Sequence, residues 1–87
     1  MAFDPRKDAL NVARHGISLG RAFDMDLDLT ITFPDRRFGY GEDRFISIGP
    51  IDAELYVLAH TYRDEEIRPI SLRRAAKAEK KLYRESW

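Results

Sequence analysis

The segment ELYVLAHTYRDEEIRPISLRRA, residues 54–75, contains the clearest structural signal in the chain. Its first ten residues are rich in tyrosine, valine and leucine and predict a strand, and the three acidic residues that follow predict a turn. A second strand is expected over 67–70. Proline cannot donate a ladder hydrogen bond, so Pro69 favours an edge position or one whose nitrogen has no ladder partner. Ser71 is a good N-cap, so we expect a basic helix over 72–84.

Two helices are predicted at the start of the chain. Asp4 is a suitable N-cap, and Pro5 at the first helical position loses no hydrogen bond there. This helix is expected to end at Gly16. Ser18 then caps a second, shorter helical stretch that is predicted to run to about Phe23.

Two further strands are predicted between these helices and the segment 54–75. Apolar and polar residues alternate over 27–33, which is typical of a half-buried strand, and residues 44–49 form the next strand. Residues 34–43 have the composition of a loop, which is a candidate lid. The whole chain, 1–87, is therefore predicted to be a single α+β domain: two N-terminal helices, a four-stranded antiparallel sheet and a C-terminal basic helix, with the helices on one face of the sheet.

Composition limits the functions that remain possible. The chain has 87 residues and no cysteine, which excludes disulfides and thiolate metal sites. Its two histidines lie 45 positions apart, which is not a metal-ligand spacing, and we expect no cofactor. No apolar run reaches the roughly 20 residues of a membrane span, and the N-terminus lacks the pattern of a signal peptide, so a cytoplasmic location is expected.

Charge is distributed unevenly along the chain. Fifteen basic residues balance fifteen acidic residues overall, but residues 68–84 contain seven basic residues and one acidic residue, Glu79. A basic terminal segment on a neutral protein fits either a nucleic acid or an acidic partner protein. Both partners remain possible from the charge pattern.

His60 is the first candidate for chemistry. It lies in the strand predicted over 54–63, on the same face as Tyr56, Leu58 and Tyr62. Imidazole is suited to proton transfer near neutral pH, which favours a catalytic residue. The alternative is a packed polar residue without a chemical role.

Four arginines flank the last turn and the start of the predicted terminal helix: Arg63, Arg68, Arg73 and Arg74. We expect their side chains to converge at one end of the sheet. A planar guanidinium stays charged and can bind two phosphate oxygens, so the cluster favours contact with RNA. For each arginine the alternative is an ion pair with a nearby carboxylate, such as that of Glu42.

Charged residues on the predicted helices have less direct roles. Glu79 lies on the helix face that should pack on the sheet, so it is expected to hold a strand arginine in place without itself reacting. Lys7, Asn11 and Arg14 share one surface of the first helix. A solvated surface is the default interpretation, and contact with RNA or a partner is the alternative.

Several blocks of sequence, taken together, resemble one protein family. They are Phe3-Asp4-Pro5-x-Lys7, Asn11-x-x-Arg14-His15-Gly16-Ile17-Ser18-Leu19, Gly41-Glu42-x-Arg44-x-x-x-x-Gly49, His60-Thr61-x-Arg63 and Ile67-Arg68-x-Ile70-Ser71-x-Arg73-Arg74-Ala75, followed by Glu79 and Tyr83. In this order and spacing the chain is similar to the BrnT toxins, which are small bacterial ribonucleases of type II toxin-antitoxin modules with a fold related to RelE.

The resemblance implies an RNA-cleaving toxin that inhibits translation. It also implies a BrnA-like antitoxin with a ribbon-helix-helix region, which neutralises the toxin and binds operator DNA. The toxin and the antitoxin are expected to form hetero-oligomers, commonly with two copies of each protein. Matched by motif, the residues that the resemblance points to are Glu42, Arg44, His60, Arg63, Arg68, Arg73 and Arg74.

The resulting hypothesis is metal-independent cleavage in which the 2′-hydroxyl of the RNA attacks the adjacent phosphate. His60 or Glu42 would accept the proton. The arginines expected to stabilise the phosphate in the transition state are Arg63, Arg68 and Arg74. Further RNA contacts are expected from Arg44, Arg73, Lys77, Tyr62 and Tyr83, the tyrosines by stacking on bases. The alternative is a module of the same fold that binds RNA or an antitoxin without catalysis.

Overall fold

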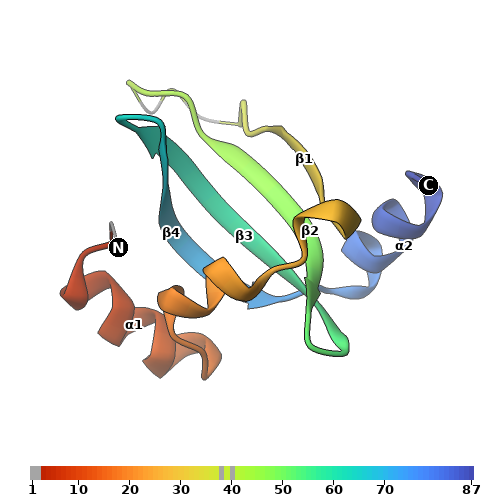
Figure 1. Cartoon of the computed structure of the whole chain (residues 1–87), viewed down its shortest axis with the longest axis horizontal. Helices are drawn as coiled ribbons and strands as arrows, with labels where there is room; N and C mark the ends of the chain where they lie inside the picture. Colours follow the sequence, from red (N-terminus) through yellow and green to blue (C-terminus); the bar gives the residue numbers. More distant parts are fainter. Residues whose placement is uncertain (1–2, 38, 40) are drawn as a thin grey trace.

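The fold is a four-stranded antiparallel sheet with helices on both faces (Figure 1). A computed structural model describes residues 3–37, 39 and 41–87. The strands lie in the order β1-β2-β3-β4, so each strand pairs with its neighbour in the sequence. The predicted α+β class and the four-stranded antiparallel sheet are confirmed. Phe38 and Tyr40, which belong to the predicted lid loop, lie outside the described residues.

Helix α1 (Pro5–His15) begins and ends where the sequence predicts. The Asp4 carboxylate accepts a hydrogen bond of 2.9 Å from the backbone N–H of Arg6, which caps the first turn. Gly16 ends the helix in the left-handed conformation, with φ at 70°, which glycine adopts without steric cost. Both boundaries therefore follow from local backbone chemistry.

Two 3₁₀ helices follow, η1 (Leu19–Asp24) and η2 (Leu27–Leu29). The first corresponds to the predicted short helical stretch. The second corrects the prediction of a strand that starts at residue 27. The Asp26 carboxylate accepts a hydrogen bond of 3.1 Å from the N–H of Asp28 and caps a helical turn, so β1 (Ile31–Pro34) begins later.

The remaining strands are β2 (Phe45–Ile51), β3 (Glu54–Arg63) and β4 (Glu66–Arg74). The bounds of β3 agree with the prediction, and β2 extends two residues further than expected. β4 lies at the edge of the sheet, as Pro69 predicted. The register shifts beside Pro69, because Ala59 pairs with Ser71 whereas His60 pairs with Pro69.

The end of β4 corrects the predicted start of the last helix. Ser71 pairs with Ala59 inside the ladder, so it is a strand residue and not an N-cap, and the strand continues to Arg74. Helix α2 (Lys77–Glu85) begins only after this. Neither α2 nor any other helix within the described ranges is both long and apolar enough to cross a membrane.

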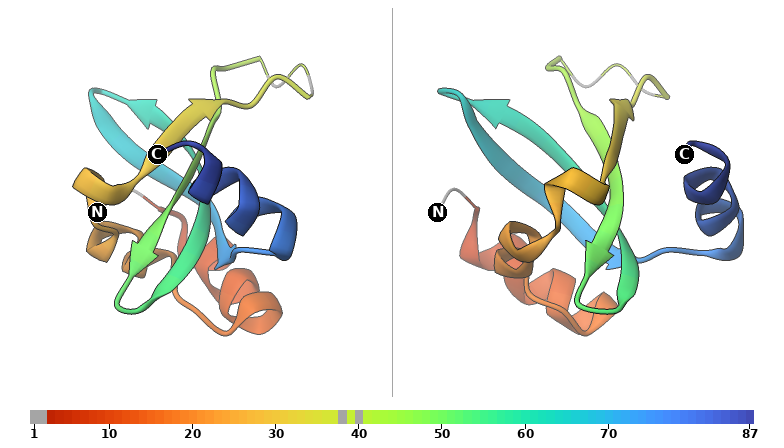
Figure 2. Two further views of the ribbon diagram at one scale, coloured as in Figure 1. Left: turned by 90° about the vertical axis from the view of Figure 1, so that its right-hand side faces the viewer. Right: turned by 45° about the vertical axis from the view of Figure 1, so that its right-hand side comes forward.

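Two apolar clusters pack on opposite faces of the sheet. Leu19 from η1 packs with Leu58, whereas Ala75 and Tyr83, before and within α2, pack with Val57. Val57 and Leu58 are neighbours in β3, and successive side chains of a strand point to opposite faces. Figure 2 shows the same arrangement, with α2 on one side of the sheet and the N-terminal helices on the other. The prediction that all helices cover one face is therefore wrong.

Candidate functional site

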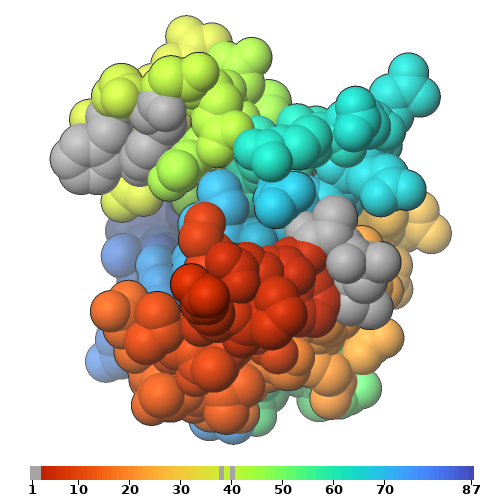
Figure 3. Space-filling view, turned by 90° about the vertical axis from the view of Figure 1, so that its left-hand side faces the viewer, coloured from red at the N-terminus to blue at the C-terminus, as the bar shows by residue number. Residues whose placement is uncertain are grey.

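A small basic pocket lies where the start of α1 meets the ends of β3 and β4. Its volume is about 120 Å³. It is lined by Asp4, Lys7, Glu42, Arg44, Thr61, Arg63, Arg68, Pro69 and Ile70. Figure 3 shows the surfaces that meet here: α1 in red, β3 and β4 in cyan to blue, and the loop before β2 in yellow-green. Four cationic and two anionic side chains line the pocket, an excess of two positive charges (4 − 2).

Strand pairing brings the arginines of the pocket together. Arg68 pairs with Thr61 across β3 and β4, and Arg63 follows Thr61 by two residues on the same face. The Thr61 hydroxyl donates a hydrogen bond of 2.6 Å to the carbonyl of Asp43, which fixes the end of the loop against β3. Arg44 is the next residue, so this bond also brings its side chain to the pocket.

Glu42 is the carboxylate that lies among these cations. One of its oxygens is 3.7 Å from Nε of Arg44 and the other is 3.8 Å from a terminal nitrogen of Arg63. Both distances exceed the range of a direct hydrogen bond. The Glu42 side chain is 37% exposed, so a ligand in the pocket can reach it. Among the described residues, no three His, Cys, Asp or Glu side chains are grouped so as to hold a metal ion.

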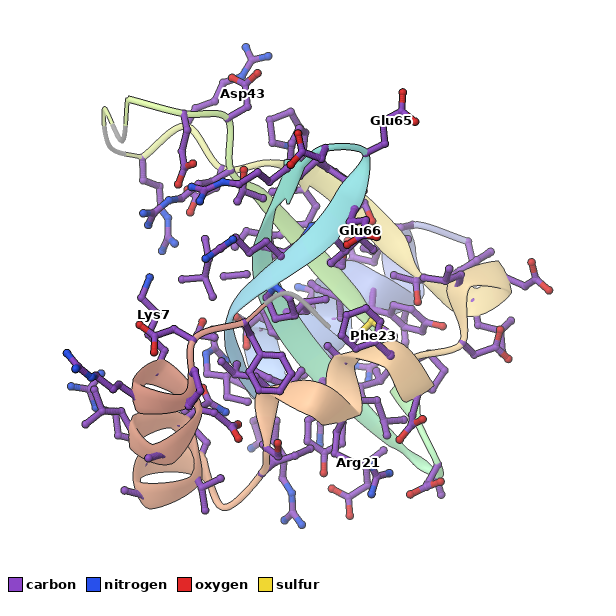
Figure 4. The ribbon with its side chains drawn as sticks, turned by 60° about the vertical axis from the view of Figure 1, so that its left-hand side comes forward. Lys7, Arg21, Phe23, Asp43, Glu65 and Glu66 are labelled. Atoms are coloured by element: carbon purple, nitrogen blue, oxygen red, sulfur yellow. The ribbon has the colours of Figure 1, made fainter. Side chains whose placement is uncertain are left out.

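Lys7 lines the same pocket, although the sequence favoured a solvated surface for it. Figure 4 shows Lys7 extending from α1 toward the end of the sheet where the Asp43 loop lies. Helical periodicity cannot reveal this position, because it depends on where α1 lies against β4. The available signal was the block Phe3-Asp4-Pro5-x-Lys7 in the family resemblance.

Asn11 holds α1 against the edge of β4. Its amide nitrogen donates to the carbonyl of Leu72 at 2.8 Å and to that of Ile17 at 2.9 Å, and its amide oxygen accepts from the N–H of Leu72 at 3.0 Å. Asn11 is 5% exposed, so the default prediction of a solvated surface is wrong for it. Lys7 lies one turn earlier on the same side of the helix, so this anchor also positions Lys7.

The structure does not bring His60 to the pocket. The ring is 1% exposed, on the opposite face of β3 from Arg63. Its Nε2 is 2.8 Å from the Ser47 hydroxyl, which in turn is 2.7 Å from that of Thr32. Burial lowers the pKa of His60 below its ordinary value of 6.5, so the ring is neutral at pH 7. Tyr62 shares this face and packs edge-on against the His60 ring.

Arg73 also lies outside the pocket, paired with Glu79. Its two terminal nitrogens donate to the two carboxylate oxygens, one at 2.7 Å. Glu79 also accepts a hydrogen bond of 2.7 Å from the N–H of Ala76 at the start of α2. The hydrogen bonds from Arg73 are the main reason that the pKa of Glu79 is lowered, although partial burial opposes the shift. The expected pairing of Glu79 with a strand arginine is therefore present.

Arg74 lies near the opposite end of the sheet, where it pairs with Glu54 at 3.0 Å. It is six residues from Arg68 along β4, a distance of roughly 20 Å in an extended strand. The prediction that all four arginines converge is therefore wrong, because β4 is a strand where a helix was expected. Of the other expected RNA contacts, Lys77 is exposed at the start of α2, and the Tyr83 hydroxyl donates to the carbonyl of Leu29.

A family model matches most of the chain. The model of the family described as "Ribonuclease toxin, BrnT, of type II toxin-antitoxin system" matches residues 3–79 of 87. All nine residues that line the basic pocket lie within the matched range. No curated protein matches the chain.

Proposed function

The chain belongs to the BrnT family of ribonuclease toxins of type II toxin-antitoxin systems, and we propose that its basic pocket cleaves RNA without a metal ion and thereby inhibits translation. The observation that carries this proposal is the set of cations around one carboxylate, Glu42: Lys7, Arg44, Arg63 and Arg68. The scissile phosphate gains negative charge in the transition state, and cations held in place beforehand stabilise that charge.

In this proposal Glu42 is the base. Its carboxylate takes the proton of the 2′-hydroxyl, whose oxygen then forms a bond to the adjacent phosphorus. The bond from phosphorus to the 5′-oxygen breaks, which leaves a 2′,3′-cyclic phosphate and a 5′-hydroxyl. The departing oxygen takes up a proton, and the Lys7 ammonium is the donor that we assign. Arg63 and Arg68 bind the non-bridging oxygens, with Arg44 beside them.

Two of the residues first considered for catalysis are left out of this proposal. His60 is buried on the opposite face of the sheet, so it supports the strand that carries Arg63 and transfers no proton. Arg74 is paired with Glu54 at the other end of β4. We retain Arg73 and Lys77 only as contributors to the positive field that attracts RNA.

Membership of the family supports three further parts of the proposal. The first is that the fold is related to RelE, and the second is that the protein acts in the cytoplasm. The third concerns its partner. Type II modules contain a protein antitoxin, which we take to be a BrnA-like protein with a ribbon-helix-helix region. It would bind operator DNA and form hetero-oligomers with this chain.

The test is cleavage of total RNA in EDTA by the purified, antitoxin-free protein and two variants, Arg68→Ala and Arg74→Ala. These arginines lie on the same strand, one in the pocket and one outside it. Arg68→Ala is expected to lower the rate by about 100-fold, as for the loss of one oxyanion-hole donor. Arg74→Ala is expected to cleave like the wild type, and the products should end in a 2′,3′-cyclic or 3′-phosphate.

Two results would contradict the proposal. Equal losses in both variants would show that the rate does not depend on the pocket. RNA binding with no new ends, in the wild type and with ribosomes added, would favour the non-catalytic module of the same fold.

A further inference from the structure

An apolar groove runs between α2 and the face of the sheet on which α2 packs. Its volume is about 270 Å³. The apolar residues that line it are Phe33, Pro34, Ile46, Ile48, Val57 and Leu82. Leu82 lines the groove from α2 and keeps 46% of its surface exposed. Large apolar side chains left accessible beside a groove are typical of a surface that binds another protein.

The rim of the groove is charged, with an excess of positive groups. Arg36, Arg37 and Arg73 line it, together with Asp35 and Glu79. Arg37 pairs with Asp35 at 2.9 Å, and Arg73 pairs with Glu79. The outer surface of α2 adds exposed basic side chains from Lys77, Lys80, Lys81 and Arg84. The surroundings of the groove therefore favour a partner with acidic groups around an apolar centre.

The groove and the basic pocket lie on the same face of the sheet. Val57 in the groove and Thr61 in the pocket are four residues apart in β3, so their side chains point the same way, roughly 13 Å apart. Ile46 in the groove and Arg44 in the pocket are two residues apart, so their side chains also point to the same face. An extended or helical segment laid along this face passes from apolar side chains to arginines.

We propose that the groove and the pocket together are the docking site for one segment of the protein antitoxin. Aliphatic side chains of the segment fill the groove beside Leu82, and carboxylates further along it reach Arg63 and Arg68. The antitoxin would then inhibit by occupying the cleavage site, so this part rests on the proposed function. RNA fits the groove less well, because the centre of the groove is apolar and only its rim offers cations to phosphates.

The test compares two leucine-to-aspartate variants in binding to the antitoxin encoded beside this chain. Leu82→Asp places a carboxylate in the groove, and Leu10→Asp places one on α1 at a position that is 55% exposed, against 46% for Leu82. We expect Leu82→Asp to weaken binding by at least about tenfold, as for a buried anchor residue, and Leu10→Asp to bind like the wild type. RNA cleavage by both variants in EDTA should stay within about twofold of the wild type, because neither residue lines the pocket.

Three outcomes decide between the possibilities. Normal binding by Leu82→Asp, or loss only in Leu10→Asp, would overturn the docking site. Loss of RNA cleavage by Leu82→Asp, with normal binding of the antitoxin, would assign the groove to RNA. Weakened antitoxin binding by Leu82→Asp alone, with no cleavage by the wild type, would support the docking site while contradicting the proposed ribonuclease.

A second measurement covers the case in which Leu82→Asp does not fold. Hydrogen exchange of the wild-type complex should show slower exchange than the free toxin in α2, β1 and β2. Unchanged exchange in all three elements, with slower exchange elsewhere, would also overturn the proposal.

Discussion

The side chain of Asn11 acts as the strand partner of Leu72. It accepts from the N–H and donates to the C=O of the same residue, at 3.0 and 2.8 Å, as a backbone neighbour in a sheet would do. These two hydrogen bonds cover the outer edge of β4 at a buried position. Edge strands that stay open invite pairing with other chains, so α1 protects this edge as well as positioning the pocket.

Asn11→Ala should therefore lower the free energy of unfolding by about 2 to 4 kcal/mol, because it leaves buried backbone groups without partners. Urea unfolding of the purified variant measures this. Val12→Ala is the control, since Val12 is the next residue on α1 and is 46% exposed. A similar loss in both variants would show that the bonds to Leu72 are not the cause.

The burial of His60 predicts that stability depends on pH below neutrality. Its pKa in the folded protein lies below 6.5, so between that lower value and 6.5 the unfolded chain binds more protons. The free energy of unfolding should fall as pH falls through this window. His60→Gln should remove that part of the pH dependence, which urea unfolding at a series of pH values would reveal.

The same variant tests whether His60 takes part in cleavage. Because the ring is buried away from the pocket, we expect folded His60→Gln protein to cleave RNA within about tenfold of the wild type. A loss of 100-fold or more, at a pH where the variant is shown to be folded, would return His60 to the catalytic residues.

The ion pair of Arg73 and Glu79 predicts a pH-dependent attachment of α2. The pKa of Glu79 is lowered, chiefly by Arg73, so its stabilising effect is present above the ordinary value of 4.5 and is lost as pH falls through the lower folded value. Glu79→Gln should lower the melting temperature near neutral pH, and the difference from the wild type should shrink in acid. Glu85→Gln is the control, because Glu85 is 63% exposed near the other end of α2 and its pair with Lys81 is long, at 3.8 Å.

Lys7 predicts a change in the salt dependence of RNA binding. If its ammonium contacts one phosphate, Lys7→Ala should make the slope of log K against log salt shallower by about 0.7, the value for one contact on a single strand. Arg6→Ala is the control, since Arg6 is adjacent on α1 but does not line the pocket. Fluorescence anisotropy with a labelled RNA measures both slopes. Equal changes would mean that Lys7 acts only through net charge.

Local chemistry was sufficient to predict the elements whose boundaries depend on nearby residues. The Asp4 cap and the left-handed Gly16 define α1, and the pattern of residues 54–63 defines β3. The family was also visible in the order of short motifs. These features could be predicted because each depends on residues within a few positions of one another, whose interactions are the same wherever the segment lies in the fold.

Tertiary structure alone decided the end of β4 and the membership of the pocket. Ser71 is chemically suited to cap a helix, but pairing with Ala59 keeps it in a strand, and Arg74 is thereby carried away from Arg68. Lys7 enters the pocket and His60 is buried because α1 lies along β4 and the two faces of β3 have different neighbours. Contacts between residues as distant as 11 and 72 determine these outcomes, and the pattern of either segment alone does not contain them.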